Sequence, residues 1–368
     1  MATHSGRVAV VLPPREGFAT GAVGAIGLQV AALASPDDVI VGPPLAGPSL
    51  LPGHEYRPVR PGLWPPGGRG LRYAATVTRV VTDIAPAVVE VHNRPDIAHH
   101  VARGRPGQKM LLVLHNDPQG MRGADTPALR AALLSRMAVA CVSGWVRQRF
   151  AEGLPADAAQ WIGLSPNGMN TPAAVLPQSA RGRVVLFAGR VVADKGADLF
   201  VDACERLGPA HPGWRFVMIG ADRFRKDAPA TPFLNALAPR ARAAGVEMAG
   251  YRPHADVLDA MAQAAIVVVP SRWPEPFGLT ALEAMAAGAA LVAAPMGGLP
   301  EVVGDGGILC APEPVAGLAQ AIGTLMDDVA ARAALGGRGR ARAARFSVEH
   351  ARACRAAQRL AALRGGGG

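Results

Sequence analysis

The chain has 368 residues, of which half are hydrophobic and 18% are charged, and its formal net charge is +10. This length suggests about two domains, and this composition excludes a disordered chain because it supplies enough apolar surface for a large core. No apolar run reaches the ~18 to 20 residues that a membrane-spanning helix needs. The four cysteines are far apart and lack metal-site spacing, which favours buried reduced thiols and a cytoplasmic protein.

Short apolar strands alternate with alanine-rich helical segments along the chain. The first predicted strand, residues 7–12, is too short for a secretory leader and ends in prolines. The other predicted strands span residues 39–41, 87–92, 110–115 and 138–143 in the first half, and residues 183–189, 215–220, 265–270 and 289–295 in the second. Their continuous apolar character is typical of parallel strands that helices cover on both faces. The β-α-β order predicts two doubly wound, Rossmann-like α/β domains.

Two stretches rich in proline and glycine interrupt this order. Residues 166–182 ("PNGMNTPAAVLPQSARG") predict the domain boundary, so we expect an N-terminal domain over residues 1–172 and a C-terminal domain over residues 173–345. Residues 42–70 form a long loop, for which a binding loop and an unstructured surface excursion are both open. The glycines that end the sequence predict a disordered tail.

Most of the positive charge lies near the end of the sequence. One acid, Glu349, accompanies nine arginines at positions 332, 338, 340, 342, 345, 352, 355, 359 and 364. A solvated helix face, an anionic membrane and nucleic acid are the three possible explanations of such a run. Only Phe346 lies among the arginines to stack on bases, so no nucleic-acid partner is expected, and the other two explanations stay open.

Polar residues and glycines follow three predicted strands of the second half, where ligands of doubly wound sheets bind. After residues 183–189, Gly189 permits close approach of a ligand, and Arg190 and Lys195 supply two cations suited to a diphosphate. Taken alone, a solvated loop explains these cations better. Gly297 and Gly298 open a further turn after residues 289–295, and this turn is expected beside the residues that follow strand 265–270.

The second cluster follows residues 265–270 and includes "PEPFGLTALEAMAAG" (274–288). Its two prolines forbid a helix at the start, so a helix begins near Gly278, and its first free N–H groups form an anion site. Glu275 precedes this helix and Glu283 lies about one turn inside it. A phosphate at the helix start would have one carboxylate on each side. As isolated residues, Glu275 as a helix cap and Glu283 as a solvent-facing carboxylate remain the alternative.

The motif order G-R-x4-K-G (189–196), P-S-x3-E-P-F-G-L-x3-E-A-M-A-x-G (270–288) and G-G-L-P-E-V-V (297–303) resembles the retaining GT-B glycosyltransferases of glycosyltransferase family 4. The resemblance covers nearly the whole chain and includes "HND", "VSGWVRQRF" and "PNGMN" in the first half. The pair "VHNRP" and "LHNDP" is similar to bacterial members that build surface or spore-coat polysaccharides. The resemblance implies two domains that face each other across a cleft, and a C-terminal helix, residues 346–368, that crosses back to the first domain.

The resemblance also implies a role for single residues. Arg190 and Lys195 would hold the donor diphosphate and offset its charge as the nucleotide leaves. Glu275 would accept hydrogen bonds from the donor sugar, and Glu283 from the ribose. His115, at the end of its strand, would face the donor sugar across the cleft.

The remaining expected site residues contact the base, the phosphates or the acceptor. They are Tyr251 and Leu258 at the base, the backbone of Gly278, Leu279 and Thr280 at the phosphates, Gly189 close to the donor, Gly21 beside the diphosphate or the acceptor, and His92 and Asn116 on the acceptor side. For His92 a structural role, and for Asn116 a turn-forming role, are equally open.

The implied reaction is retaining transfer of a hexose-type sugar from a UDP- or GDP-linked donor to a saccharide or lipid-linked acceptor, in the synthesis of cell-surface polysaccharide or glycolipid. The nucleotide sugar is a cosubstrate, and no cofactor or metal is expected because the sequence has no Asp-x-Asp triplet. The enzyme would be cytoplasmic, and peripheral contact of the arginine-rich segment with an anionic membrane at the inner face of the plasma membrane stays open.

Four other functions compete with this one. A sugar-nucleotide epimerase or a phosphorylase would use the same two-domain scaffold. A nicotinamide-dependent enzyme is disfavoured, because glycines 21, 24 and 27 follow the first strand after a gap and with the wrong spacing. A non-enzymatic binding protein is disfavoured by the intact set of Arg190, Lys195, Glu275 and Glu283.

Overall fold

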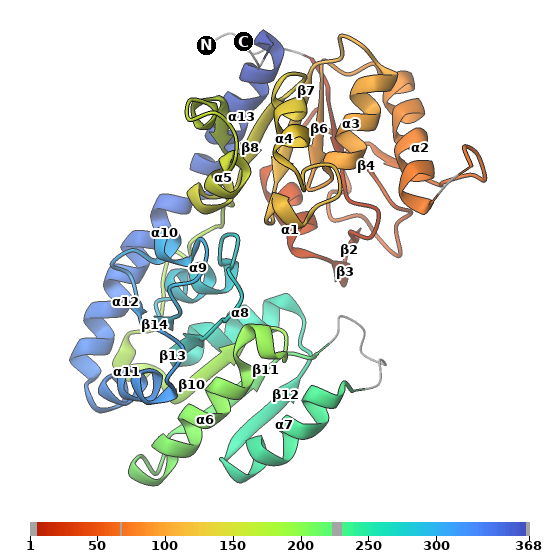
Figure 1. Ribbon diagram of the computed structural model, residues 1–368. Helices are drawn as coiled ribbons and strands as arrows, with labels where there is room; N and C mark the ends of the chain where they lie inside the picture. The colour runs from red at the N-terminus through yellow and green to blue at the C-terminus, as the bar shows by residue number, and fades with distance from the viewer. Residues whose placement is uncertain (1–5, 67, 223–229, 366–368) are drawn as a thin grey trace. The chain divides into compact units, whose positions relative to one another are not determined.

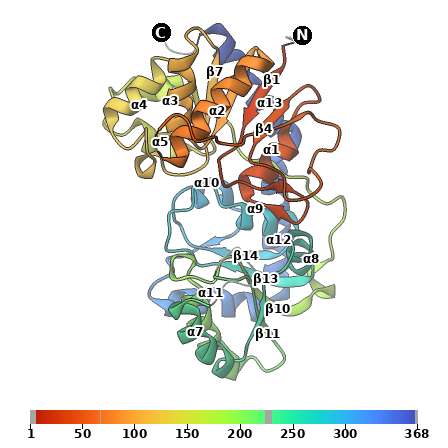
Figure 2. The same cartoon turned by 90° about the vertical axis from the view of Figure 1, so that its right-hand side faces the viewer.

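The computed structural model describes residues 6–66, 68–222 and 230–365, so the predicted tail beyond residue 365 lies outside the described residues. The chain divides into two compact units. Unit 1 runs to Gly168 and takes up the chain again from Val348, and unit 2 spans Met169–Ser347. Each unit is a parallel sheet with helices on both faces (Figures 1 and 2). This confirms the predicted fold class, two doubly wound α/β domains.

The sheet of unit 1 has seven parallel strands in the order β5-β4-β1-β6-β7-β8-β9. They are β1 (Val8–Val11), β4 (Val39–Gly42), β5 (Tyr56–Pro58), β6 (Val88–His92), β7 (Met110–Leu114), β8 (Ala138–Cys141) and β9 (Ile162–Leu164). All five predicted strands are confirmed. The prediction of residues 42–70 as a loop is partly wrong, since β5 lies within it and pairs with β4 at the sheet edge. The three residues of β5 include an arginine and a proline, so they form no apolar run from which a strand could be predicted.

Helices cover both faces of this sheet. They are α1 (Ala25–Leu33), α2 (Arg69–Ile84), α3 (Pro95–Gly104), α4 (Pro127–Leu134), α5 (Gly144–Ala151) and α13 (Val348–Arg364). Helices α2 and α3 pack together over β1, β6 and β7, while α13 packs on α1 and on β6 to β9 (Figure 1). A hairpin of β2 (Phe18–Ala19) and β3 (Ala22–Val23) precedes α1. The end of the sequence therefore belongs to the unit in which the sequence begins.

The sheet of unit 2 has six parallel strands in the order β12-β11-β10-β13-β14-β15. They are β10 (Gly182–Ala188), β11 (Arg215–Ile219), β12 (Val246–Gly250), β13 (Ala264–Val269), β14 (Ala290–Ala293) and β15 (Ile308–Leu309). The four predicted strands are confirmed, and the two edge strands, β12 and β15, were missed. The strand order reverses between β10 and β13. In open α/β sheets, ligands bind beyond the carboxyl ends of the strands at such a switch point.

The helices of unit 2 pack in two groups. They are α6 (Ala197–Leu207), α7 (Pro232–Ala243), α8 (His254–Gln263), α9 (Leu279–Ala286), α10 (Leu299–Val303), α11 (Val315–Asp327) and α12 (Val329–Ala343). Helix α6 packs on α7 and α11, and α9 packs on α8, α10 and α12. Among the described helices, none combines the length and the apolar character that crossing a membrane requires.

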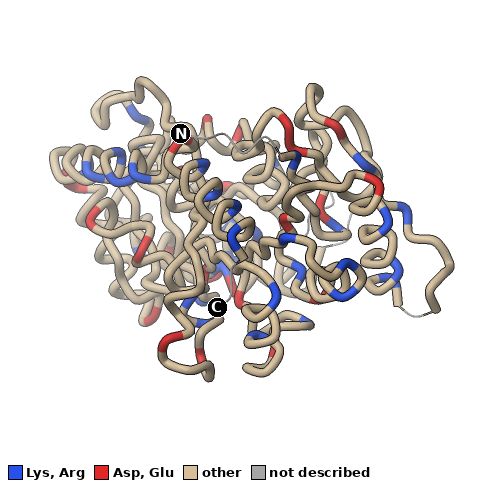
Figure 3. The backbone as a smooth tube through the Cα atoms, turned by 90° about the horizontal axis from the view of Figure 1, so that it is seen from above, with Lys and Arg blue, Asp and Glu red and all other residues tan. Residues whose placement is uncertain are grey.

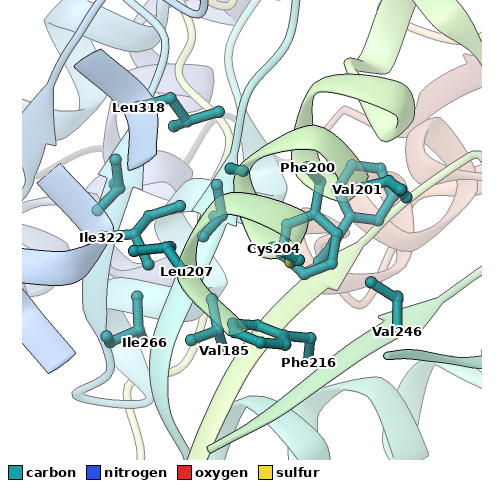
Figure 4. Packing of buried hydrophobic residues seen from close by; sticks show 14 of the residues in the cluster. Val185, Phe200, Val201, Cys204, Leu207, Phe216, Val246, Ile266, Leu318 and Ile322 are labelled. Carbon is teal, nitrogen blue, oxygen red and sulfur yellow. The ribbon is translucent and has the colours of Figure 1, made fainter. Parts of the chain in front are cut away.

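A large hydrophobic core lies between the sheet of unit 2 and helices α6, α7 and α11. Figure 4 shows Phe200 of α6 and Ile322 of α11 facing Val185, Phe216 and Ile266 of the sheet. Burying side chains of this size contributes about 1.5–3 kcal/mol each. This packing fixes β10 and β13, and with them the loops that follow the two strands.

Candidate active site

The carboxyl ends of β10 and β13 carry two of the charged residues predicted for the site. Lys195 ends the short 3-10 helix η4 (Ala193–Lys195) after β10, and Glu275 lies in the loop after β13. The side chains are 80 residues apart in the sequence, but β10 and β13 are neighbours in the sheet. The fold therefore brings both residues to the switch point of unit 2.

Lys195 and Glu275 form a partly buried ion pair. Nζ of Lys195 donates to Oε1 of Glu275 at 2.5 Å, and the hydroxyl of Ser271 donates to the same oxygen at 2.7 Å. The lysine and glutamate side chains are 24% and 12% exposed, so water screens this pair less than a surface ion pair. The carboxylate is thus held by Lys195 and Ser271, in place of the helix-capping role that the sequence left open. Ser271 was not among the predicted site residues, although it lies within the P-S-x3-E motif.

Helix α9 begins at Leu279, which confirms the start predicted from the prolines before it. Its N-cap, Gly278, has φ +101°, a left-handed conformation that strains any other residue. A Cβ atom at Gly278 would also lie 2.5 Å from Cδ2 of Leu299. The first N–H groups of an α-helix have no intrahelical acceptor and carry a partial positive charge. The glycine turn therefore leaves this helix end suited to an anionic group.

A small cavity of about 40 Å³ brings these elements together. Its polar and glycine lining consists of Gly189, Lys195, Ser271, Glu275 and Thr280. Such a volume accommodates one water molecule or hydroxyl group, so a whole sugar would extend beyond it. Residues from the end of β10, the loop after β13 and the start of α9 thus line one small polar cavity.

The turn after β14 packs directly against Glu275. The backbone N–H of Gly298 donates to the carbonyl of Glu275 at 2.6 Å. Gly297 has φ +64°, and a Cβ atom there would lie 2.3 Å from the same carbonyl oxygen. The close approach of the two loops requires glycine at this position. The predicted proximity of this turn to the second cluster is confirmed.

Glu283, one turn inside α9, is paired with His254 at the start of α8. Nε2 of His254 lies 2.8 Å from Oε1 of Glu283, whose side chain is 15% exposed. The alternative of a solvent-facing Glu283 is therefore wrong. The hydrogen bond to Glu283 raises the pKa of His254 above its ordinary value, which favours the protonated ring beside the carboxylate. His254 was not among the predicted site residues, because it lies 29 positions from Glu283 and on a different helix, so no local pattern links the two.

The other predicted donor residues of unit 2 surround the same loops. Gly189 and Arg190 follow β10, and Arg190 is exposed. Tyr251 follows β12 and is 50% exposed, and Leu258 lies on α8, which packs on α9. These positions place the residues on neighbouring loops and helices, while their roles in binding remain predictions.

The predicted residues of unit 1 fall into two groups. His92 ends β6 and His115 follows β7, and Nδ1 of His92 lies 2.9 Å from Nε2 of His115. Asn116, beside them, is exposed, and its backbone N–H donates to the side chain of Asn93 at 3.1 Å. Gly21 lies apart from these residues in the turn between β2 and β3, with φ +77°.

The arginine-rich segment is mostly engaged in contacts within the protein. Seven of its arginines donate to carbonyl, hydroxyl or carboxylate groups, namely Arg332, Arg338, Arg340 and Arg342 of α12 and Arg352, Arg355 and Arg359 of α13. The explanation as a solvated helix face is wrong for Arg332 and Arg355, which are 7% and 3% exposed. Figure 3 shows that basic (blue) and acidic (red) positions both occur along the backbone.

Residues 182–328 match the family model described as "Glycosyl transferases group 1". Among curated proteins, glycogen synthase of Mycobacterium tuberculosis is 35% identical over 192 residues, which are 51% of this chain and 41% of that protein. The lipopolysaccharide core biosynthesis mannosyltransferase LpsB of Rhizobium meliloti is 35% identical over 168 residues, which are 44% of this chain and 46% of that protein. The chain thus spans less than half the length of these two relatives.

Solved structures with a similar fold cover nearly the whole chain. Anabaena HepE in complex with UDP and glucose has a TM-score of 0.76 at 20% identity and covers 96% of this chain and 99% of its own. WaaG, a glycosyltransferase involved in lipopolysaccharide biosynthesis, has a TM-score of 0.70 at 16% identity and covers 96% and 99%. Residues 182–328 therefore carry a group 1 glycosyl transferase domain, and the described chain has the two-unit α/β fold of the GT-B glycosyltransferases.

Proposed function

We propose that this chain is a retaining glycosyltransferase of family 4. It would transfer a hexose-type sugar from a UDP- or GDP-linked donor to a saccharide or lipid-linked acceptor in cell-surface polysaccharide or glycolipid synthesis. The observation that carries this proposal is the convergence of Lys195, Glu275 and the glycine-capped start of α9 at the switch point of unit 2. The match of residues 182–328 to group 1 glycosyl transferases supports the reaction class.

The chemistry of this point suits a nucleotide-diphosphate sugar. A diphosphate has the negative charge that Lys195, Arg190 and the start of α9 can offset. Oε1 of Glu275 is occupied by Lys195 and Ser271, so we assign Oε2 to the hydroxyls of the donor sugar. The HepE structures, which contain UDP with glucose or UDP-glucose, support a donor of this kind.

The ribose would lie between the start of α9 and α8. Glu283 accepts hydrogen bonds from the ribose hydroxyls in this proposal, and His254 orients its carboxylate through Oε1. Tyr251 and Leu258 would contact the base. The sugar and the ribose thus take one carboxylate each, with the phosphates on the glycine turn between them.

The reaction breaks the bond between the anomeric carbon and the phosphate oxygen and forms a bond to an acceptor hydroxyl. Positive charge develops on the sugar ring while negative charge gathers on the diphosphate, where Arg190 and Lys195 stabilise it. The acceptor attacks from the face that the phosphate leaves, and the departing phosphate takes the hydroxyl proton. The absence of an Asp-x-Asp triplet from the sequence supports transfer without a metal ion.

The names of the relatives support the proposed acceptor class. They include LpsB and a lipopolysaccharide 1,2-N-acetylglucosaminetransferase of Salmonella typhimurium, both named for lipopolysaccharide. We propose a cytoplasmic enzyme that reaches its acceptor at the inner face of the membrane. Most arginines of the C-terminal segment donate hydrogen bonds within the protein, which leaves fewer of them for a membrane. Liposome flotation at low salt with acidic lipid tests the membrane contact separately from the transfer reaction. A protein that stays unbound removes the membrane contact and leaves the transfer reaction untouched.

A screen of UDP- and GDP-sugars by thermal shift identifies the donor, and NMR of the transfer product then gives its anomeric configuration. We expect the configuration of the donor to be kept and the rate to be unchanged by EDTA. Inversion would overturn the retaining mechanism, and loss of activity in EDTA would overturn metal independence. Isomerisation of the nucleotide sugar without transfer would instead identify an epimerase, and phosphate-dependent release of a sugar phosphate would identify a phosphorylase.

A further inference from the structure

Unit 1 contains a chain of buried polar side chains that ends at His115. Glu90 and His92 lie on the same face of β6, and both side chains are 0% exposed. His115 follows the neighbouring strand β7 and is 8% exposed. A carboxylate inside a sheet is unfavourable unless charges and hydrogen bonds compensate for the lost water. The compensation here comes from the other end of the sequence.

Two arginines of α13 neutralise Glu90. Arg355 donates through Nη1 to Oε1 at 2.5 Å, and Arg359 donates through Nε to Oε2 at 2.7 Å. Arg359 also makes two hydrogen bonds to Asp38, at 3.0 and 2.9 Å, and Nε of Arg355 donates to Ser165 at 2.6 Å. Burial alone would raise the pKa of Glu90, but Arg359 and Arg355 hold it well below its ordinary value. Glu90 is therefore a carboxylate, and its charge and that of Asp38 balance the two arginines.

This charged carboxylate determines where the proton of His92 lies. Nε2 of His92 lies 2.7 Å from Oε1 of Glu90, and a carboxylate only accepts hydrogen bonds, so Nε2 bears a proton. Arg355 Nη1 lies 3.5 Å from the same nitrogen, beyond ordinary hydrogen-bond distance, so it does not compete as the donor. In the neutral ring of His92, Nδ1 is then the acceptor.

The protonation of His92 in turn determines which ring nitrogen of His115 carries a proton. Burial lowers the pKa of His92, and burial together with His92 and Arg355 holds the pKa of His115 well below its ordinary value, so both rings are neutral. Nδ1 of His92 accepts across the 2.9 Å contact, so the donor is Nε2–H of His115. A neutral imidazole has one N–H, and Nδ1 of His115 is therefore an acceptor.

We infer that Glu90 and His92 are positioning residues that fix His115 as the Nε2–H tautomer, so that its Nδ1 accepts a hydrogen bond from a sugar hydroxyl. The hydroxyl belongs to the donor sugar or to the acceptor saccharide. The inference rests on the proposed function for the identity of the ligand. Asn93 holds the backbone of His115 as well, because its Oδ1 accepts from the backbone N–H of His115 at 3.0 Å. A permanently neutral acceptor binds and orients a hydroxyl, and it does not supply a proton.

NMR of the full chain with ring-¹⁵N histidine tests the tautomer without any substrate. The signals of His92 and His115 are assigned by their loss in His92→Phe and His115→Asn. We expect both rings to carry the proton on Nε2 and to stay neutral at pH 7. A proton on Nδ1 of His115, or a doubly protonated ring, would overturn the inference. If no nucleotide sugar is turned over, the proposed function fails, and the ring signals still decide the tautomer.

Kinetics test whether the fixed tautomer serves the reaction. His92→Phe keeps a ring but removes the acceptor for His115, so His115 should populate both tautomers and kcat/KM should fall about tenfold. His100→Phe, at a half-buried histidine of α3 in the same unit, is the matched control and should leave kcat/KM unchanged.

Substitution of His115 itself separates the acceptor atom from the rest of the ring. In His115→Asn, Oδ1 can take the place of Nδ1, so this variant should keep about tenfold more activity than His115→Leu. A rise in KM for the nucleotide sugar assigns the hydroxyl to the donor, and a rise in KM for the saccharide assigns it to the acceptor. Equal activity of the Asn and Leu variants would refute the role of Nδ1. If His92→Phe fails to fold, the wild-type ring signals still decide the tautomer.

Discussion

Replacing Glu275 with glutamine is the most informative single change in the candidate active site. Glutamine keeps the volume of the side chain and one carbonyl oxygen, but it removes the charge that Lys195 and Ser271 hold in place. The amide can also turn its NH₂ group toward Lys195, where a donor faces a donor. Glu275→Gln therefore tests the charge and the orientation of this group without opening a cavity.

The size of the effect follows from the contacts. Hydrogen bonds that involve a charged partner contribute about 1.5–3 kcal/mol each. Loss of the charged acceptor for the sugar hydroxyl and of the orienting contact to Lys195 adds up to about 3–6 kcal/mol in the transition state. This free energy corresponds to a fall in kcat/KM of about 150-fold to 25,000-fold. The effect on folding is smaller, about 1–2 kcal/mol, because Lys195 is 24% exposed and can be solvated.

The assay combines transfer kinetics with chemical unfolding. Glu247→Gln is the matched control, because Glu247 forms an exposed ion pair with Arg215 at 2.5 Å in the same sheet. The control should keep full activity and lose at most about 0.5 kcal/mol of stability. If Glu275→Gln folds and keeps its activity within about twofold, Glu275 does not hold the donor sugar and the site assignment is refuted.

Three further predictions address the surroundings of the site. Gly297→Val should lower both stability and kcat/KM, because its Cβ atom would meet the carbonyl of Glu275, and a variant with wild-type melting and kinetics would contradict the close approach of these loops. His254→Ala should raise KM for the nucleotide sugar by releasing Glu283. Because the folded state raises the pKa of His254, the pairing of His254 with Glu283 stabilises the fold fully below about pH 6.5, and this stabilisation is lost as pH rises through the folded-state pKa. His254→Ala should therefore lose more stability at pH 6 than at pH 8. The opposite trend would refute the pairing. Arg355→Met should lower the free energy of unfolding by about 3–5 kcal/mol, measured by urea unfolding, because the buried carboxylate of Glu90 loses one of its two positive partners. A loss below about 1 kcal/mol would contradict the buried pair.

Much of the fold could be predicted because the central strands are buried on both faces and therefore read as apolar runs. The edge strands gave no such signal. β5 consists of "YRP", β15 has two residues, and β12 reads "VEMAG", so none of them has a continuous apolar run. Their pairing depends on neighbouring strands rather than on their own composition, and a local pattern does not reveal it.

The parts of the site that depend on local geometry were also predictable. The start of α9 follows from two prolines and Gly278 within a few residues of one another. The pairing of His254 with Glu283 depends on how α8 packs on α9, which no spacing encodes. The arginines of α13 appeared as a run of charge, whereas the carboxylates that bind Arg359 lie 269 and 321 positions earlier. Charge partners at such separations become visible only in the folded chain.

Isothermal titration of the wild-type protein and of Glu275→Gln with a nucleoside diphosphate and the matching nucleotide sugar tests the central claim most directly. The account predicts that a UDP- or GDP-sugar binds in a ratio of one to one. It also predicts that Glu275→Gln weakens the binding of the nucleotide sugar at least about tenfold more than the binding of the free nucleoside diphosphate, because Glu275 contacts the sugar. Equal weakening of both ligands, or no binding of any nucleotide sugar, would contradict the account.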